Sequence, residues 1–273
     1  MSATGPRPGT PVPGTVVVTG AARGLGRAIA HRVARKDRPV AVVDLDLRSY
    51  AHFPAEKALM THESTDAELR AAGFCSRGYE ADLTDLDRVR DTIAAIENDL
   101  GPITGLVCNA GGGSGGIHDN RAGSLASAAL EQALRHNLTT TVNTCVAVVP
   151  GMVTRGRGSV VVMSSVNGVD PTEDGAYAHY GVAKAAVTMY ARYLARDVGP
   201  AGVRVNVIAP GTVPTGRLKD LWAGTPGQDP AARTALRRLP EPSEVADSAH
   251  YLLDDHSSYV TGQVLVLDGG RTP

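Results

Sequence analysis

The chain has 273 residues, of which 42% are hydrophobic and 20% charged, and its formal net charge is -1. This length and composition suit one large domain with a sizeable buried core. The near-neutral charge argues against nucleic acid or an anionic membrane surface as a partner, since both are recognised through excess positive charge. No apolar run reaches the roughly 20 residues that a membrane-spanning helix needs.

The first 13 residues are rich in Pro and Gly and lack the apolar stretch of a secretory signal. We therefore expect a disordered tail over 1–13 and a single domain over 14–273. Three cysteines, Cys75, Cys108 and Cys145, have no C-x-x-C spacing, which favours reduced thiols and a cytoplasmic location. The histidines are scattered without metal-ligand spacing, so no metal site is predicted.

Short β-branched runs alternate with longer helical patterns along the chain. The predicted strands cover 15–20, 39–46, 76–83, 103–111, 158–165, 203–211 and 262–270. The predicted helices cover 24–36, 85–100, roughly 124–154, roughly 176–198 and a last segment that begins near Pro242. The strands are continuous apolar runs, as expected where helices cover both faces of a sheet. The alternation predicts an α/β fold, a Rossmann-type doubly wound parallel sheet with helices on both faces.

Three stretches fall outside this alternation. Residues 47–72 read as an insertion, 111–123 as a glycine-rich loop and about 212–241 as a substrate lid. The lid offers apolar side chains at Leu218, Leu221 and Trp222. Trp222 is equally compatible with a place in the core.

The segment TGAARGLG, residues 19–26, ends the first predicted strand and opens the first predicted helix. Gly20, Gly24 and Gly26 lie where the turn is tight and where backbone must approach a ligand closely. A helix N-terminus at this point offers free N–H groups and the positive end of the helix dipole to an anion. This context predicts a phosphate cradle for a dinucleotide.

Asp44 ends the second predicted strand, 24 residues after Gly20. An acid there accepts hydrogen bonds from the adenosine ribose hydroxyls and repels a 2′-phosphate, which favours NAD over NADP. Arg23 is the opposing signal, because an arginine near the ribose can accommodate that phosphate. NAD is the predicted cofactor, and NADP is the alternative.

Six motifs, taken in order, resemble the short-chain dehydrogenase/reductase family. They are TGAARGLG, CNAG (108–111), Asn137, the serine pair 164–165, YGVAK (180–184) and APG (209–211). The resemblance runs from about residue 14 to 270. It implies a single-domain ketoreductase or alcohol dehydrogenase that uses a nicotinamide cofactor. It also implies a homotetramer and a small-molecule alcohol or ketone as the substrate.

Two tyrosines precede Lys184 on the predicted helix. Tyr180 is one turn away, about 6 Å along the axis, and Tyr177 is two turns away, about 10.5 Å. A free tyrosine has a pKa near 10, too high for an efficient base at neutral pH, and a nearby cation lowers it. Tyr-x3-Lys resembles the family's ketoreductases, and Tyr-x6-Lys resembles its enoyl reductases. Ser165 upstream and the form of the glycine motif favour Tyr180.

The resemblance implies a role for each residue of the catalytic set. Tyr180 is the general acid and base, Lys184 lowers its pKa and holds the nicotinamide ribose, and Ser165 stabilises the alkoxide. The backbone carbonyl of Asn137 positions a water that continues the proton relay. The cofactor-binding residues implied are Gly20, Arg23, Gly24, Leu25, Gly26, Asp44, Asp82, Leu83, Asn109, Ala110, Gly111, Tyr180, Lys184, Pro210, Gly211, Val213 and Thr215.

The interval between Ser165 and Tyr180 is slightly longer than the family usually shows. We place the extra residues in DPTEDG, 170–175, a turn-rich stretch at the substrate rim. A glycine-rich loop and an apolar lid at the same rim predict a bulky or cyclic secondary alcohol, or its ketone. With NAD as the partner, alcohol oxidation is the expected direction. Two rival hypotheses are an enoyl reductase that uses Tyr177 and a non-catalytic dinucleotide-binding sensor.

Overall fold

The computed structural model describes residues 14–116, 118–216, 218–219 and 230–271. The expected tail, 1–13, therefore lies outside the described residues. So do Leu221 and Trp222 of the expected lid, whereas Leu218 is described and half-buried.

Seven parallel strands form one sheet in the order β3-β2-β1-β4-β5-β6-β7. Their bounds are β1 Thr15–Thr19, β2 Val40–Asp44, β3 Ser76–Glu80, β4 Ile103–Cys108, β5 Gly158–Met163, β6 Val203–Pro210 and β7 Val264–Leu267. Each predicted strand is present and ends slightly before its predicted boundary. The strand order reverses between β1 and β4, and ligands of open α/β sheets bind in the crevice at such a point.

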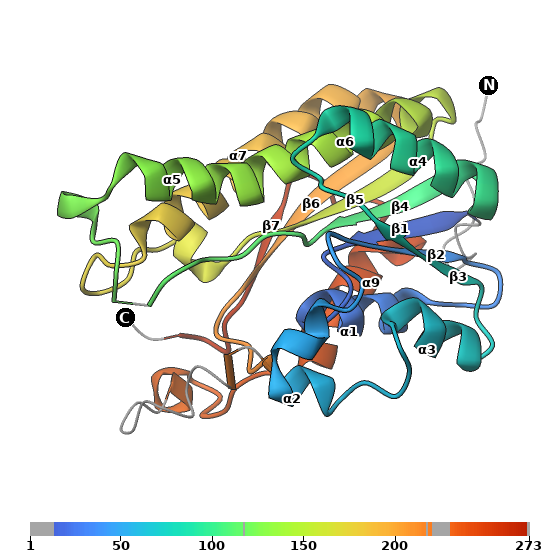
Figure 1. The fold of residues 1–273 in the computed structure, drawn as a ribbon. Helices are drawn as coiled ribbons and strands as arrows, with labels where there is room; N and C mark the ends of the chain where they lie inside the picture. Colours follow the sequence, from blue (N-terminus) through green and yellow to red (C-terminus); the bar gives the residue numbers. More distant parts are fainter. Residues whose placement is uncertain (1–13, 117, 217, 220–229, 272–273) are drawn as a thin grey trace.

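Helices cover both faces of the sheet, as the alternation predicts (Figure 1). One face carries α4 Leu86–Leu100, α5 Ser127–Leu134, α6 Thr140–Thr154 and α7 Ala178–Val198. The other carries α1 Gly24–Val33, α3 Thr65–Ala71 and α9 Pro242–Leu253. The helix predicted over 124–154 is α5 and α6 joined by a π-helical turn, Arg135–Thr139. Among the described residues, no helix has the length and apolar character needed to span a membrane.

Two hydrophobic clusters lie on the two faces of the sheet. Strands β1, β2, β4 and β5 are buried over almost their whole length, so β-branched side chains pack on both faces. Ile96 of α4 and Met152 of α6 are fully buried in one cluster, and Ile29 of α1 is fully buried in the other. The edge strands β3 and β7 are more exposed.

The insertion 47–72 folds into two short helices between β2 and β3. A 3-10 turn, Ser49–His52, leads into α2, Pro54–Lys57, and the chain then reaches α3. Ser64 caps α3 by accepting a hydrogen bond from the Ala67 backbone N–H. The insertion therefore lies beside the start of α1, next to the carboxyl ends of β1 and β2 (Figure 1).

Candidate active site

The glycine segment brings β1, α1 and β4 closer together than any side chain would allow. Gly20 has φ +62°, and a Cβ there would lie 2.8 Å from the Ala110 Cα. A Cβ on Gly26 would lie 2.0 Å from the Gly20 carbonyl oxygen. The side-chain amide of Asn109 fastens the turn by donating to the carbonyls of Thr19 and Gly20, at 3.1 and 2.9 Å. This glycine-rich turn at a helix N-terminus is the kind of backbone that binds the diphosphate of a dinucleotide.

Asp44 lies against this cradle at the end of β2. Its carboxylate accepts hydrogen bonds from the Ala22 and Leu45 backbone N–H groups, both at 2.9 Å. Burial raises the carboxyl pKa above its ordinary value, although these hydrogen bonds act in the opposite direction. The Arg23 guanidinium lies 4.4 Å from the centre of the Phe53 ring, which belongs to the insertion.

Asp82 and Leu83 follow β3 at the same edge of the sheet. The Asp82 carboxylate accepts from the backbone N–H and the hydroxyl of Thr84, at 2.9 and 2.7 Å, and these bonds lower its pKa. The Leu83 side chain is buried, and its carbonyl accepts from the Asn143 amide at 3.0 Å. These contacts hold the segment that follows β3 in place.

Lys184 lies in α7 with its ammonium buried beneath Tyr180. Nζ donates to the Met163 carbonyl at 2.8 Å, and the residue is 5% exposed. Nζ also lies 5.7 Å from the centre of the Tyr180 ring. Burial lowers the Lys184 pKa to about 8, because a charged ammonium loses its water there. The structure thus brings the predicted lysine and tyrosine together.

The two serines after β5 have different surroundings. The Ser164 hydroxyl donates to the Lys184 carbonyl at 2.9 Å and accepts from Thr188 at 2.7 Å, so it has a structural position. Ser165 opens the 3-10 turn 166–168, and its Oγ accepts from the Asn167 N–H at 3.2 Å.

That turn packs directly on α7. A Cβ on Gly168 would lie 2.6 Å from the Lys184 backbone carbonyl carbon, and one on Gly181 would lie 2.8 Å from the Asn167 carbonyl oxygen. Ser165 is therefore held at the helix that carries Tyr180.

Tyr177 precedes α7 and faces the glycine-rich loop. Its φ is +58°, an uncommon backbone conformation for a side chain of this size. A Cβ on Gly113 would lie 1.9 Å from the Tyr177 hydroxyl oxygen, so a larger residue at 113 would displace that hydroxyl. The two tyrosine rings lie 5.2 Å apart between centres. Next to Tyr180 in sequence, the buried His179 places Nε2 3.1 Å from the Ser114 carbonyl, which implies a proton on Nε2.

Asn137 lies in the π-helical turn between α5 and α6 and is fully buried. Its carboxamide pairs with the backbone of Gly112, accepting from the N–H and donating to the carbonyl, both at 3.0 Å. Its backbone carbonyl accepts from the hydroxyls of Thr140 and Thr141, at 3.1 and 2.8 Å. Asn137 therefore fixes the glycine-rich loop where it leaves β4, just after Asn109, Ala110 and Gly111.

The loop after β6 returns across the crevice to the start of α1. Gly211 donates its N–H to the Leu267 carbonyl at 2.8 Å, which extends the β6–β7 pairing beyond Pro210, and Val213 is buried. A Cβ on Gly24 would lie 3.6 Å from the Thr215 methyl carbon. The expected nicotinamide-side loop and the expected phosphate cradle are therefore in contact.

Charged contacts join three segments of the expected substrate rim: the glycine-rich loop 111–123, residues 170–175 and the expected lid 212–241. Asp174 of the 170–175 stretch lies 3.3 Å from His118 Nδ1 and 3.6 Å from the Arg121 guanidinium. Glu173 pairs with Arg233 of the expected lid. Residues 170–175 therefore link the glycine-rich side of the rim to the lid side.

One residue that contacts the glycine segment, Glu56, was not predicted from the sequence. The Glu56 carboxylate in α2 accepts from the backbone N–H of Gly24 at 3.2 Å and of Gly216 at 2.8 Å. Nothing in the sequence around 56 shows a periodic or motif pattern that would have indicated this contact.

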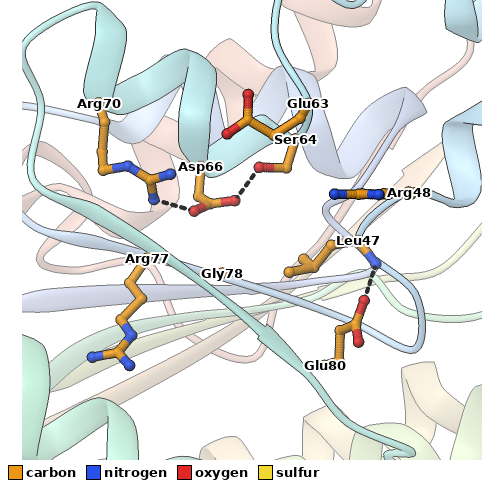
Figure 2. Close-up of a pocket in the computed structure, with 9 residues that line it drawn as sticks. All are labelled: Leu47, Arg48, Glu63, Ser64, Asp66, Arg70, Arg77, Gly78 and Glu80. Atoms are coloured by element: carbon orange, nitrogen blue, oxygen red, sulfur yellow. Dashed lines mark hydrogen bonds and ion pairs between the residues drawn. The ribbon is translucent and has the colours of Figure 1, made fainter.

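A separate hollow of about 560 Å³ lies between the insertion and the edge strand β3 (Figure 2). Three acids and three arginines line it, so it has no net preference for a charge. They are Glu63, Asp66, Glu80, Arg48, Arg70 and Arg77. It contains none of the predicted site residues.

Comparisons with known proteins agree with this geometry. Residues 20–272 match a family described as enoyl-(acyl carrier protein) reductase. Cyclohexanol dehydrogenase of Rhodococcus sp. (strain TK6) is 40% identical over 94% of this chain and 95% of its own length. The 2-(S)-hydroxypropyl-CoM dehydrogenase 3 of Xanthobacter autotrophicus is 33% identical over 94% of this chain and 96% of its own length.

The same agreement extends to solved structures. A 3-oxoacyl-[acyl-carrier protein] reductase with bound NAD from Brucella melitensis superposes with a TM-score of 0.80 at 30% identity. The match covers 99% of this chain and 97% of that one. Sheet order, glycine cradle and sequence similarity point the same way: the chain belongs to the short-chain dehydrogenase/reductase family and is a nicotinamide-dependent oxidoreductase acting on CH–OH groups.

Proposed function

We propose that the chain interconverts a bulky or cyclic secondary alcohol and its ketone, with Tyr180 as the general acid and base. The observation that carries this proposal is the buried Lys184 ammonium beneath the Tyr180 ring. When bound, the nicotinamide ring supplies the hydride acceptor or donor of the reaction. The residues of the chain then have only to bind the substrate oxygen and move its proton.

The proton chemistry follows from the surroundings of Tyr180. A positive charge on Lys184 favours the anionic form of the tyrosine side chain, which accepts the alcohol proton during oxidation. The same hydroxyl returns a proton to the ketone during reduction. Ser165 donates a hydrogen bond to the substrate oxygen and stabilises negative charge that develops there. In the proposed relay the Asn137 carbonyl holds a water, for which it must exchange one of the two threonine hydroxyls that it accepts from in the structure.

Tyr177 is the alternative base, as in an enoyl reductase, a reaction that the matching family's description names. The contact between the Tyr177 hydroxyl and Gly113 supports a role as a wall of the substrate side instead. A Lys184 ammonium that lies beside the Tyr180 ring supports the shorter spacing.

We propose NAD as the preferred cofactor. Asp44 supports it, because its carboxylate lies at the edge of the cradle where a 2′-phosphate would meet a negative charge. The Arg23 guanidinium stacks on Phe53 of the insertion. Because this arginine already has a contact within the protein, it is a weaker signal for a 2′-phosphate, which also supports NAD. With NAD, oxidation of the alcohol is the proposed direction.

The substrate class is supported by the rim and by one relative. The glycine-rich loop carries no bulky side chain over 111–116, which leaves room above the expected nicotinamide position. The relative from Rhodococcus is named for a cyclic secondary alcohol.

A cytoplasmic homotetramer is the proposed assembly. Exposed apolar side chains on α6, α7 and β7, among them Val146, Met189, Tyr193 and Leu265, support contacts between copies. Light scattering that gives the mass of a monomer would exclude the tetramer.

Replacing the proposed base tests the reaction directly. Tyr180→Phe is expected to lower kcat for cyclic ketones by about 10²–10⁴-fold, the usual contribution of general acid–base catalysis. NADH consumption with cyclic, bulky and small linear ketones measures the loss and the substrate range together. Tyr177→Phe is the matched control and should keep kcat within about tenfold.

The opposite pattern would identify the rival. If Tyr177→Phe is the inactive variant and an α,β-unsaturated thioester is the better substrate, the enoyl-reductase hypothesis holds. A wild type that binds NADH but turns over none of these compounds supports the non-catalytic sensor.

Removing the acid at the ribose edge tests the cofactor. The wild type is expected to prefer NAD over NADP by on the order of 100-fold in kcat/KM, because a like charge beside a phosphate costs several kcal/mol. Asp44→Ser should remove most of that preference, whereas Asp46→Ser, two residues further on, should keep it. Equal use of both cofactors by the wild type would contradict the assignment.

The buried charge of Lys184 serves catalysis but lowers the stability of the folded protein. The folded state lowers the Lys184 pKa from its ordinary 10.5 to about 8, so it disfavours the charged form. Below pH 8 this penalty is fully present, and it fades as the pH rises from 8 to 10.5. Lys184→Met removes this penalty but leaves the buried Met163 carbonyl without its donor. We therefore expect an inactive protein whose stability relative to the wild type falls by on the order of 1–3 kcal/mol between pH 7 and pH 10.

Urea unfolding at both pH values measures this difference. Lys57→Met, at an exposed lysine, is the control and should change stability little. A stability difference between Lys184→Met and the wild type that is the same at pH 7 and pH 10 would contradict the penalty.

A further inference from the structure

The Glu56 carboxylate connects three segments that are distant in the sequence. It projects from α2 of the insertion and is 2% exposed. One oxygen accepts from the Gly24 N–H at 3.2 Å and the other from the Gly216 N–H at 2.8 Å. A Cβ on Gly216 would lie 2.6 Å from the Glu56 Cγ, so the two residues are in direct contact.

Gly24 marks the point where an anion is expected to bind. It is the first residue of α1, so its N–H has no acceptor within the helix and lies at the positive end of the helix dipole. In dinucleotide-binding folds the diphosphate binds at this helix N-terminus. A carboxylate of the protein itself, that of Glu56, accepts from that N–H.

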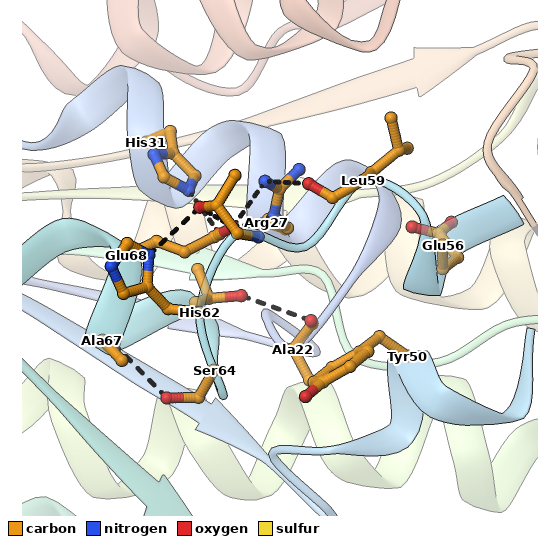
Figure 3. A network of polar contacts seen from close by, with 12 residues as sticks. Ala22, Arg27, His31, Tyr50, Glu56, Leu59, His62, Ser64, Ala67 and Glu68 are labelled. Carbon is orange, nitrogen blue, oxygen red and sulfur yellow. Dashed lines mark hydrogen bonds and ion pairs between the residues drawn. The ribbon is translucent and has the colours of Figure 1, made fainter. Parts of the chain in front are cut away.

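The insertion holds Glu56 there through several separate contacts (Figure 3). The Thr65 hydroxyl donates to the Ala22 carbonyl at 3.2 Å. Arg27 of α1 pairs with Glu68 at 2.7 Å and donates to the Leu59 carbonyl at 3.0 Å. These bonds fix the segment after α2, and the contact of Phe53 with Arg23 fixes the residue before it, so the position of Glu56 is built into the fold.

We propose that Glu56 sets the affinity for the cofactor by competing with its diphosphate for the N-terminus of α1. A dinucleotide brings a negatively charged diphosphate to the N–H group that the buried carboxylate occupies, and two negative charges that share one N–H group repel each other. Binding therefore requires the carboxylate to leave the Gly24 N–H, which also releases Gly216 and the loop after β6. The inference rests on the proposed dinucleotide function and adds an internal competitor to it.

Binding of ADP, measured by titration calorimetry on the full chain, tests the inference without any turnover. Glu56→Gln keeps the size of the side chain but removes its charge. Its dissociation constant for ADP is expected to fall by about tenfold, equivalent to 1.4 kcal/mol. Adenosine, which has no phosphate, should bind wild type and variant equally. Glu63→Gln, an exposed acid of the same insertion, should bind ADP like the wild type.

Three results would overturn the inference. Unchanged ADP affinity in Glu56→Gln means that the carboxylate does not compete. Weaker ADP binding means that Glu56 holds the site together. If neither wild type nor variant binds ADP or NADH, the cofactor assignment fails as well, so the two failures are distinguishable. Should Glu56→Gln not fold, Glu56→Ala removes both the charge and the acceptor, and tighter ADP binding is again expected.

Discussion

The attachment of α7 to the carboxyl end of β5 is the contact on which the candidate site depends. Lys184 Nζ donates to the Met163 carbonyl, and the Ser164 hydroxyl donates back to the Lys184 carbonyl. Both bonds are buried, where an unmade partner would cost more than in water. They fix the helix that carries Tyr180 relative to β5, which is followed by Ser165.

Around that junction, glycine residues occupy the positions where the backbone approaches another segment of the chain closely. Gly20 and Gly26 let β1, α1 and β4 meet, and Gly113 leaves room for the Tyr177 hydroxyl. The polar residues that hold these loops, such as Asn137, are fully buried and hydrogen-bonded. The crevice is therefore lined by a rigid backbone, which suits a site that must orient two reactants.

The insertion adds a second layer to the cofactor end of the crevice. Phe53 stacks on Arg23, Thr65 bonds to the Ala22 carbonyl, and Glu56 reaches the first N–H of α1. The cofactor end is consequently bordered by charge of both signs. Its electrostatics differ from those of a bare glycine cradle, in which the helix dipole acts alone.

The sequence by itself determined the sheet and the glycine turn, because these depend on local periodicity and short spacings. Its spacing placed Tyr180 one turn from Lys184 but left Tyr177 as an alternative. Hydrophobic runs and glycine positions are read along the chain, and a four-residue interval on a helix is one turn wherever that helix lies. Only the tertiary structure decided what Glu56 touches. Its partners are 32 and 160 residues away, and no local pattern encodes contacts between segments that meet only after the chain has folded.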